Sequence, residues 1–560
     1  METDRENPIL EYWEQIQSGK VTVGKKVRRI YQKLAEDVSR TEGFYHFSPG
    51  RAWHAIDFIQ NFCRHSKGKM GGQPFLLELW QKAFVAAVFG FIDDDGNRQY
   101  RKALLVVARK NGKSTLSAAI GLYLMLGDGE PGAEVYSVAT KKDQAKIIWL
   151  EAKKMVKKSP LLLSKIKPLV AEMVCEYNES VYKPLGHDSE TQDGLNVHGA
   201  LMDETHAWSP DLCALYDVIA DGTTAREQPV ILITTTAGTV RGGQYDRDYE
   251  EAERIIAGYD DPEGYHDDRT LPVIYELDSR KEWTDERCWQ KANPGLGTIK
   301  SRQQLAEKVR RAAANPALVK NLVCKDFNIP ETTGGAWLTF EQLNNPETFR
   351  FDELHPAYAI GGADLSSTTD LTAAVVLFRV PGDNRLFAEC MFWLPAELLD
   401  RRVQEDKIPY DLWEQQGWLR VSEGSRVNYR DVTAWFAEIM QEHDCYLYNI
   451  GYDAWSAAYW VDDMKMHFGD ILLPVQQTMK ILSDPMKCLG AELEAKRVVY
   501  NNNPILKWCL ANTAALEDKN GNIKPAKTAS SRKRIDGLAA LLDAYVVYCE
   551  HQADYEAVAV

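Results

Sequence analysis

Short apolar runs alternate with longer amphipathic segments along residues 71–330 of the chain. Four of the runs have the length and composition of buried strands: ALLVVA, EVYSVAT, ALMDE and PVILITTTAG. Strands that alternate with helices usually form a parallel sheet covered by helices on both faces. This pattern predicts an α/β domain over residues 71–330.

A second alternating region begins at about residue 350 and extends over residues 350–560. Its apolar runs are AYAIGGADL, TAAVVLFRV, RLFAECMFWL and LYNIGYDA, and a helix is expected from Arg534 to about Glu550. The stretch Pro330–Gly335 opens a predicted linker over residues 331–349. Residues 1–70 have a polar, helical pattern, and we expect them to form an N-terminal extension.

The composition is that of an ordinary globular protein with more than one domain. The chain has 560 residues, 45% of them hydrophobic and 26% charged, and this length exceeds what one core usually accommodates. We expect no membrane span, because no apolar run approaches the ~20 residues that crossing a bilayer requires. The N-terminus lacks the pattern of a signal peptide, and the ten cysteines form no CxxC pair. These features favour a reducing cytoplasm over secretion.

The net charge of −15 argues against a protein whose whole surface binds DNA. Local basic segments remain compatible with DNA binding, and the two strongest are Lys300–Lys325 and Arg532–Arg534. Each is equally compatible with a solvated helix face, and the sequence leaves this open.

The segment Ala103–Leu126 has the layout of a phosphate-binding P-loop: an apolar strand, a tight polar turn and an apolar helix. In such loops backbone N–H groups at the helix N-terminus hold phosphates, a lysine adds charge and a hydroxyl helps to hold Mg²⁺. The match is a variant, because Val107 stands where the usual pattern has its first glycine. The residues expected to contact ATP and its metal ion are Arg109, Lys110, Asn111, Gly112, Lys113, Ser114 and Thr115.

Hydrolysis also requires carboxylates that hold the metal ion and activate water. The apolar part of GALMDETHAW leads into Asp203, which we expect to hold Mg²⁺, and Glu204, which we expect to polarise the attacking water. In the strand ILITTTAG, Thr236 is a candidate sensor of the γ-phosphate. Gln81, on an amphipathic segment upstream, is a candidate adenine contact and equally a core residue.

Phosphoryl transfer favours an arginine close to the developing negative charge. The chain has no arginine between Arg109 and Asp203, so the candidates are Arg109 in the loop itself and Arg226 before the sensor strand. The sequence does not decide between them, nor whether the arginine acts on a neighbouring subunit.

Carboxylates recur at the ends of elements in the second region. Asp364 ends the first strand, Asp453 ends a later strand, and Asp536 opens the final helix, with Asp543 two turns further on the same face. Hard cations take oxygen ligands, and two ions that clamp the attacking and leaving oxygens need shared carboxylates. This order of elements is that of an RNase H-like nuclease. Asp543 is expected either to join Asp536 as a metal ligand or to replace it.

Together these motifs resemble the large terminase subunit of tailed double-stranded DNA bacteriophages. The stretches ARKNGKST, LMDETH, ITTTAG, GGADLSSTTDLT, GYDAW and KRIDGLAALLDAY follow the order of that family. The resemblance implies an α/β protein with an ASCE-type P-loop ATPase followed by an RNase H-like endonuclease. It also implies a packaging motor that uses ATP to drive double-stranded DNA into a procapsid and cuts concatemeric DNA with Mg²⁺ or Mn²⁺.

The same resemblance implies several partners. A small terminase subunit chooses the DNA, and the large subunit docks on the portal protein of the procapsid as a homo-oligomeric ring, a pentamer in the family. We therefore expect the protein in the host cell cytoplasm, transiently docked on the procapsid and without contact to a membrane.

Other interpretations stay open on the sequence alone. P-loop ATPases and RNase H-like domains also occur in ATP-dependent nucleases of recombination, repair and mobile elements. A structural assembly protein with a vestigial nuclease is a further alternative, against which the complete carboxylate set argues. A helicase is disfavoured, because helicases usually repeat the motor fold and the sequence contains a single P-loop motif.

Overall fold

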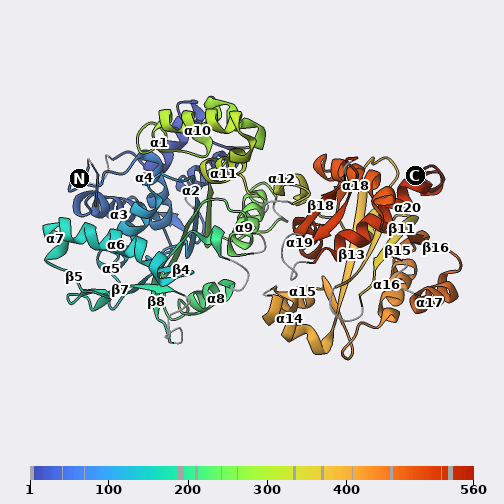
Figure 1. Ribbon diagram of the computed structural model, residues 1–560. Helices are drawn as coiled ribbons and strands as arrows, with labels where there is room; N and C mark the ends of the chain where they lie inside the picture. The colour runs from blue at the N-terminus through green and yellow to red at the C-terminus, as the bar shows by residue number, and fades with distance from the viewer. Residues whose placement is uncertain are drawn as a thin grey trace. The chain divides into compact units, whose positions relative to one another are not determined.

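The computed structural model describes the chain in segments (Figure 1), which cover residues 5–40, 42–68, 70–186, 194–208, 212–240, 243–261, 263–331, 336–366, 371–406, 408–453, 458–518, 520–527 and 534–559. The chain divides into two compact units, Met1–Glu331 and Thr332–Val560. Each unit has its own β-sheet and hydrophobic core. Within these segments, no helix combines the length and the apolar character needed to span a bilayer.

The main sheet of the first unit contains eight strands: β3 (Lys102–Val106), β4 (Glu134–Ala139), β5 (Lys167–Pro168), β6 (Met173–Cys175), β7 (Ser180–Gly186), β8 (Val197–Asp203), β9 (Val230–Thr235) and β10 (Thr270–Ile274). Their order is β10-β3-β9-β8-β4-β7-β6-β5. The strands from β10 to β7 are parallel, and β6 and β5 add an antiparallel edge. A separate ribbon pairs β1 (His46–Phe47) with β2 (Phe91–Ile92).

In this sheet β9 lies between β3 and β8. Val106 at the end of β3 pairs with Thr235, and Thr234 pairs with Asp203 at the end of β8. The three strands therefore end side by side at one edge. One strand inserted between the P-loop strand and the acidic strand is the arrangement expected for an ASCE-type ATPase.

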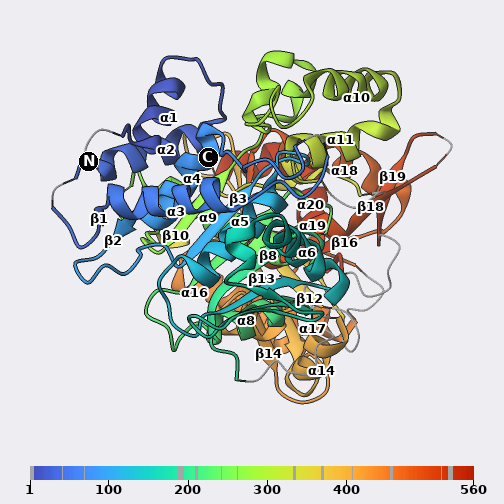
Figure 2. The same ribbon diagram turned by 90° about the vertical axis from the view of Figure 1, so that its left-hand side faces the viewer.

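Helices surround the first sheet: α1 (Pro8–Gln17), α2 (Lys25–Val38), α3 (Pro49–Phe62), α4 (Leu79–Gly90), α5 (Lys113–Leu126), α6 (Lys142–Lys158), α7 (Pro160–Leu163), α8 (Cys213–Asp221), α9 (Gln244–Gly258), α10 (Arg302–Ala314) and α11 (Pro316–Phe327), with the 3₁₀ turns η1 (Thr205–Ala207), η3 (Arg280–Thr284) and η4 (Glu286–Lys291). Helices α5 and α6 pack against β4 and β7, as Figures 1 and 2 show.

The N-terminal helices α1 and α2 share the core of the first unit. They contribute the buried residues Ile9, Tyr12, Ile16, Val27, Ile30, Tyr31 and Leu34 to it. The hydroxyl of Tyr12 lies 3.2 Å from that of Tyr275, and Lys26 pairs with Glu276 at 2.7 Å. The segment expected as an extension is therefore packed on the strand β10 side of the sheet.

Helices α10 and α11 lie side by side (Figure 2) and form a small second core of this unit with η3 and η4. Ala108, directly after β3 in the loop, belongs to this core. Within the basic segment Lys300–Lys325, Lys300 and Lys308 both pair with Asp326, at 2.9 and 3.0 Å. Part of its positive charge is thus neutralised inside the cluster. Of the segment Arg532–Arg534, Arg532 and Lys533 lie outside the described residues.

The sheet of the second unit is mixed. Its strands are β11 (Tyr358–Asp364), β12 (Thr372–Phe378), β13 (Leu386–Pro395), β14 (Leu419–Ser422), β15 (Tyr446–Asp453), β16 (Leu472–Val475) and β17 (Val498–Val499). The order is β14-β13-β12-β11-β15-β16, with β17 beside β13. Strands β13, β12 and β11 are antiparallel, and β11, β15 and β16 are parallel, which is the arrangement expected for an RNase H-like domain. A separate hairpin joins β18 (Thr513–Glu517) to β19 (Ile523–Lys527).

Helices cover both faces of this sheet: α12 (Phe340–Leu343), α13 (Phe351–Leu354), α14 (Leu399–Asp406), α15 (Tyr410–Gln415), α16 (Tyr429–Glu442), α17 (Ala458–Phe468), α18 (Met479–Glu494), α19 (Pro504–Asn512) and α20 (Asp536–Ala559), with the 3₁₀ turn η5 (Ala396–Leu398). Val375 faces the core formed with α18, α19 and α20, whereas Val376 faces that formed with α16 and α17. This alternation along β12 is why the strand reads as a continuous apolar run.

The predicted linker 331–349 is in large part folded into the second unit. Trp337 N–H donates to the carbonyl of Thr513 at 2.7 Å, and Leu343 is buried in the core beneath α18 and α19. The unit therefore starts before residue 350, because the apolar residues of this stretch have a core to enter. Residues 332–335, which include the Gly-Gly pair, lie outside the described residues.

A pair of glycines brings α20 close to the second sheet. Gly362 on β11 and Gly451 on β15 face each other in the parallel register. A Cβ added to Gly362 would overlap the carbonyl oxygen of Ala540, and one added to Gly451 would overlap that of Asp543. The main chain of α20 therefore rests directly on the main chain of both strands.

We expect Gly451→Ala to destabilise the second unit by about 1–3 kcal/mol, because the added methyl group must push α20 off the sheet. Urea denaturation measures this loss. Gly490→Ala on α18 is the matched control, and we expect it to cost less stability. Its methyl group would meet a side chain, the Trp337 ring at 3.1 Å, rather than main chain, and alanine favours a helix. An unchanged free energy of unfolding for Gly451→Ala would contradict the close approach.

Candidate nucleotide and metal sites

The turn after β3 has the backbone shape that suits a bound anion. Gly112, the N-cap of α5, has φ +83°, and Lys110 has φ +69°. This left-handed conformation costs glycine little. Helix α5 begins at Lys113, so the N–H groups of its first turn, which have no partner within the helix, end at the loop. A helix N-terminus of this kind attracts phosphate.

Three distant segments brace this loop through its main chain. Val107 N–H donates to Thr235 at 3.1 Å, Ala108 N–H to Ala292 at 3.2 Å, and Arg109 N–H to Lys325 at 3.0 Å. The Asn111 side chain, expected to contact phosphate, is buried instead and joins Ala108 to the 293–295 segment. Asn111 thus shapes the loop, and its side chain is turned away from a ligand in it.

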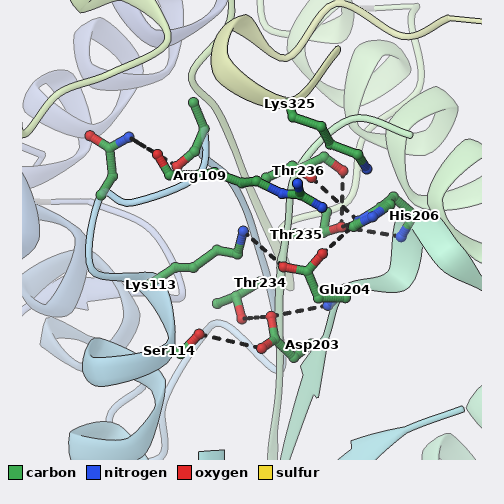
Figure 3. A network of polar contacts seen from close by, with 12 residues as sticks. Arg109, Lys113, Ser114, Asp203, Glu204, His206, Thr234, Thr235, Thr236 and Lys325 are labelled. Atoms are coloured by element: carbon green, nitrogen blue, oxygen red, sulfur yellow. Dashed lines mark hydrogen bonds and ion pairs between the residues drawn. The ribbon is translucent and has the colours of Figure 1, made fainter. Parts of the chain in front are cut away.

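Lys113 and Ser114 extend from α5 toward the carboxylates at the end of β8 (Figure 3). Lys113 Nζ lies 3.1 Å from Oε1 of Glu204. Ser114 Oγ donates to Oδ2 of Asp203 at 3.4 Å, and the hydroxyl of Thr234 donates to Oδ1 at 3.3 Å. A hydroxyl beside a carboxylate is the ligand pair that P-loop proteins offer to a divalent cation.

His206, whose role the sequence did not indicate, links Glu204 to the sensor strand (Figure 3). Its Nδ1 lies 3.2 Å from Oε2 of Glu204 and 3.2 Å from the hydroxyl of Thr235. Thr236, the candidate sensor, lies 3.4 Å from the same nitrogen and donates to Ala237 at 3.1 Å. The His206 imidazole therefore contacts both the Glu204 carboxylate and the hydroxyl groups at the end of β9.

The two carboxylates have opposite electrostatic environments. Burial, opposed by Lys113 and aided by Glu204, raises the pKa of Asp203 to about 6. Burial also opposes the ionisation of Glu204, but Lys113 and His206 outweigh it and lower the pKa of Glu204. Burial and Lys325 lower the pKa of His206 to about 3. At neutral pH both carboxylates are therefore largely ionised, and the His206 imidazole beside Glu204 is neutral.

Gln81 lies in the first turn of α4, and only the oxygen of its side-chain amide is hydrogen-bonded among the described residues. Its Oε1 accepts a hydrogen bond from Glu78 N–H at 3.0 Å and closes a capping box. Its buried Nε2 has no hydrogen-bond partner among the described residues. A Cβ built on Gly112 would lie 3.6 Å from this nitrogen. Because a buried donor without an acceptor costs about 1–3 kcal/mol, the position suits an acceptor on a bound base.

The two candidate arginines lie at opposite edges of the sheet. Arg109 is exposed in the loop, and Figure 3 shows its side chain directed toward the end of β9. Arg226 instead precedes β9, whose six residues span about 20 Å. Its guanidinium binds Asn196 at 2.7 Å, Glu130 at 2.8 Å and the carbonyl of Gly132 at 2.8 Å. Arg226 is therefore held at the edge of the sheet opposite the loop of its own chain, and its role in hydrolysis stays a prediction.

In the second unit, two carboxylates end neighbouring parallel strands. Asp364 is the last residue of β11 and Asp453 the last of β15, and the preceding residues Ala363 and Tyr452 are paired. Both side chains are half-buried. The register therefore brings the strand ends that carry them together.

The helix α20 carries the other two carboxylates. Asp536 is the first residue of the helix. Burial, followed by the negative charges of Asp536 and Asp364, raises the pKa of the Cys509 thiol, so both carboxylates lie near this side chain. Asp543 is buried, and its Oδ1 accepts a hydrogen bond from Gln477 at 2.9 Å. Burial, opposed by Gln477 and aided by Asp453, holds the pKa of Asp543 well above its usual value. Asp536 is thus associated with Asp364, and Asp543 with Asp453.

Across the described segments, no three His, Cys, Asp or Glu side chains form a group that could hold a metal ion. The four carboxylates lie along one region of the sheet and helix, but they do not form a closed cage. Carboxylates without a shared cation repel one another. Their oxygen donors nevertheless suit hard divalent ions.

Comparison with known families matches both units. A model described as "Terminase large subunit, ATPase domain" matches residues 79–254. A model described as "Terminase large subunit, endonuclease domain" matches residues 265–552. The second match begins inside the first unit and includes β10, α10 and α11.

Individual relatives cover most of the chain. The "Terminase, large subunit" of Enterobacteria phage HK97 is 28% identical over 499 residues, which are 88% of this chain and 94% of the relative. The "Terminase large subunit" of Lactococcus phage p2 is 21% identical over 551 residues, 96% and 97% of the two chains. The solved structure named "Crystal structure of the HK97 bacteriophage large terminase" covers 89% of this chain and 99% of its own, with 26% identity and a TM-score of 0.48.

We expect Arg226→Ala to lower the stability of the first unit by about 1–3 kcal/mol, because Glu130 and two carbonyl groups lose their donor. Urea denaturation provides the measurement. Arg109→Ala is the control: its exposed side chain should cost less than about 0.5 kcal/mol. Equal stability of the Arg226→Ala variant and the unmodified protein would overturn the structural role of Arg226.

Proposed function

The chain belongs to the terminase large subunit family, and from this membership and the site geometry we propose how its two active sites work. The protein is an ATPase and an endonuclease that acts in the packaging of phage DNA, and it uses a nucleotide and a divalent metal ion. The convergence of Lys113, Ser114, Asp203 and Glu204 at one edge of the first sheet carries the assignment of the motor site. An ATP-dependent repair or mobile-element nuclease is not favoured, since the phage relatives in the comparison are named terminases.

In the motor, ATP binds with its phosphates at the N-terminus of α5. The main chain from Arg109 to Thr115 and the ammonium of Lys113 hold the phosphates, and Gln81 reads the base. Ser114 and Asp203 hold Mg²⁺, which neutralises phosphate charge. Glu204, ionised beside a neutral His206, orients the attacking water. Arg109 approaches the charge that develops during transfer, and Thr236 senses the γ-phosphate.

In the nuclease, Asp364, Asp453 and Asp536 hold the metal ions, with Asp543 as an additional or alternative ligand. Mg²⁺ supplies Lewis acidity there, and Mn²⁺ is able to replace it. The proposal rests on carboxyl-bearing strand ends that are paired in register and on a helix that starts beside them. The helix dipole of α20 adds a favourable environment for the Asp536 carboxylate.

Double-stranded DNA is the polymer that we propose the motor moves and the nuclease cuts. A small terminase subunit chooses it, and the portal protein of a procapsid receives the motor as a pentameric ring in the host cell cytoplasm. Filling of purified portal-bearing capsids tests this directly, with DNase-protected DNA as the readout. Packaging that requires ATP and is lost in Lys113→Ala supports the proposal. Capsids that stay empty with the unmodified protein and a small subunit would contradict it.

We expect Glu204→Gln to keep ATP affinity within about threefold while single-turnover hydrolysis falls by at least about 100-fold, since the water loses its base. Equilibrium binding and quenched-flow measurements separate the two effects. Lys113→Ala serves as the contrast, because it should weaken binding as well. A parallel loss of affinity in Glu204→Gln would make Glu204 a metal ligand or a structural residue.

We expect Asp364→Asn to abolish plasmid cutting with Mn²⁺ and to leave ATP hydrolysis unchanged, because the two sites lie in different units. Asp536→Asn should do the same. If Asp536 were merely a dipole partner, its change would cost about 0.3–1 kcal/mol of stability and cutting would persist. Asp543→Asn is tested separately, and normal cutting by Asp536→Asn together with none by Asp543→Asn would make Asp543 the third ligand.

A further inference from the structure

Lys325 brings a third cation into the nucleotide site from a helix that the sequence motifs do not include. It lies near the end of α11 (Figure 3), and its Nζ donates to the carbonyl of Ala237 at 2.9 Å. Its own carbonyl accepts the N–H of Arg109 at 3.0 Å. Lys325 is thus fixed between the phosphate loop and the end of the sensor strand.

The charges around this position are unbalanced. Lys325 lies within electrostatic range of Arg109 and Lys113, and Glu204 is the nearby carboxylate that acts on it. Burial and the neighbouring Arg109 lower the pKa of Lys325 to about 8. A cation that is half-buried among other cations gains most from an additional anion.

We propose that Lys325 is a phosphate-contacting residue that binds the terminal phosphate of a bound nucleoside triphosphate, whereas Lys113 serves the phosphates that di- and triphosphate share. This inference rests on the proposed motor function. The N-terminus of α5 at Lys113 is where the phosphates of a nucleotide are expected to bind. Lys325 is hydrogen-bonded to Ala237, the residue next to the candidate γ-phosphate sensor Thr236. An ammonium at this place distinguishes ATP from ADP.

The position also connects the phosphate to the end of the first unit. Asn328, three residues after Lys325, accepts the N–H of Ala237 at 3.1 Å. Glu331, the last residue of the unit, donates its N–H to the carbonyl of Gly238 at 3.3 Å. Loss of the terminal phosphate would therefore remove a ligand from Lys325. The contacts of Asn328 and Glu331 with residues 237–238 lie next to it in the chain, and they hold the segment that continues into the second unit.

The test compares the affinities of ADP and of the slowly hydrolysed analogue ATPγS, with Mg²⁺, by calorimetry on the full chain. We expect Lys325→Met to weaken ATPγS about tenfold, the size of one charge-assisted hydrogen bond, and ADP less than about twofold. Lys325→Arg should restore most of the ATPγS affinity. Lys320→Met, on the same helix, is the matched control and should change neither.

Equal weakening of both nucleotides, or of neither, by Lys325→Met would overturn the proposal and leave Lys325 a brace for Ala237. If Lys325→Met unfolds, acylation of the unmodified protein followed by mass spectrometry decides instead. ATPγS should then protect Lys325 and ADP should not, and equal reactivity would overturn the proposal. Failure of the unmodified protein to bind either nucleotide would contradict the motor function itself, so the two failures are distinguishable.

Discussion

Parallel strands that are neighbours in a sheet end at the same edge, and both candidate sites depend on this constraint. In the first unit it sets the loop after β3 beside Asp203 and Thr235. In the second it sets Asp364 beside Asp453. A helix N-terminus completes each site: α5 for anions and α20 for cations, the latter through the carboxylate that opens it. The same geometry thus suits ligands of opposite charge, because the helix starts with a lysine in the first unit and with an aspartate in the second.

The part of the site that could be predicted is the part formed by consecutive residues. Gly112, Lys113, Asp203 and Glu204 were candidates because of their local chemistry and the strand or helix next to them, and the structure brings Lys113 to Glu204. Spacing does not encode the partners of Lys325 and the 293–295 segment, because these come together through the packing of α10 and α11. The α/β and RNase H-like architectures were predictable because their strands are strongly apolar.

Two differences between the sequence interpretation and the structure share a physical cause. Arg226 is close to the sensor strand in sequence, but it precedes that strand and so lies at the amino edge, away from the phosphates. The linker was placed by its turn residues, whereas the apolar Trp337 and Leu343 that follow them belong to the second core. In both cases nearness along the chain was taken for nearness in space, and the tertiary packing decided otherwise.

The hydrogen bond from Glu331 N–H to Gly238 has a mechanical consequence. Glu331 is buried, it is held in addition by Arg280 at 2.9 Å, and the chain continues from it to the second unit. Tension on that continuation would act on two contacts, the main-chain bond to the loop that follows β9 and the ion pair with Arg280. Coupling between two positions is reciprocal. If bound nucleotide changes the position of this loop, a force on the loop must change the affinity of the protein for nucleotide.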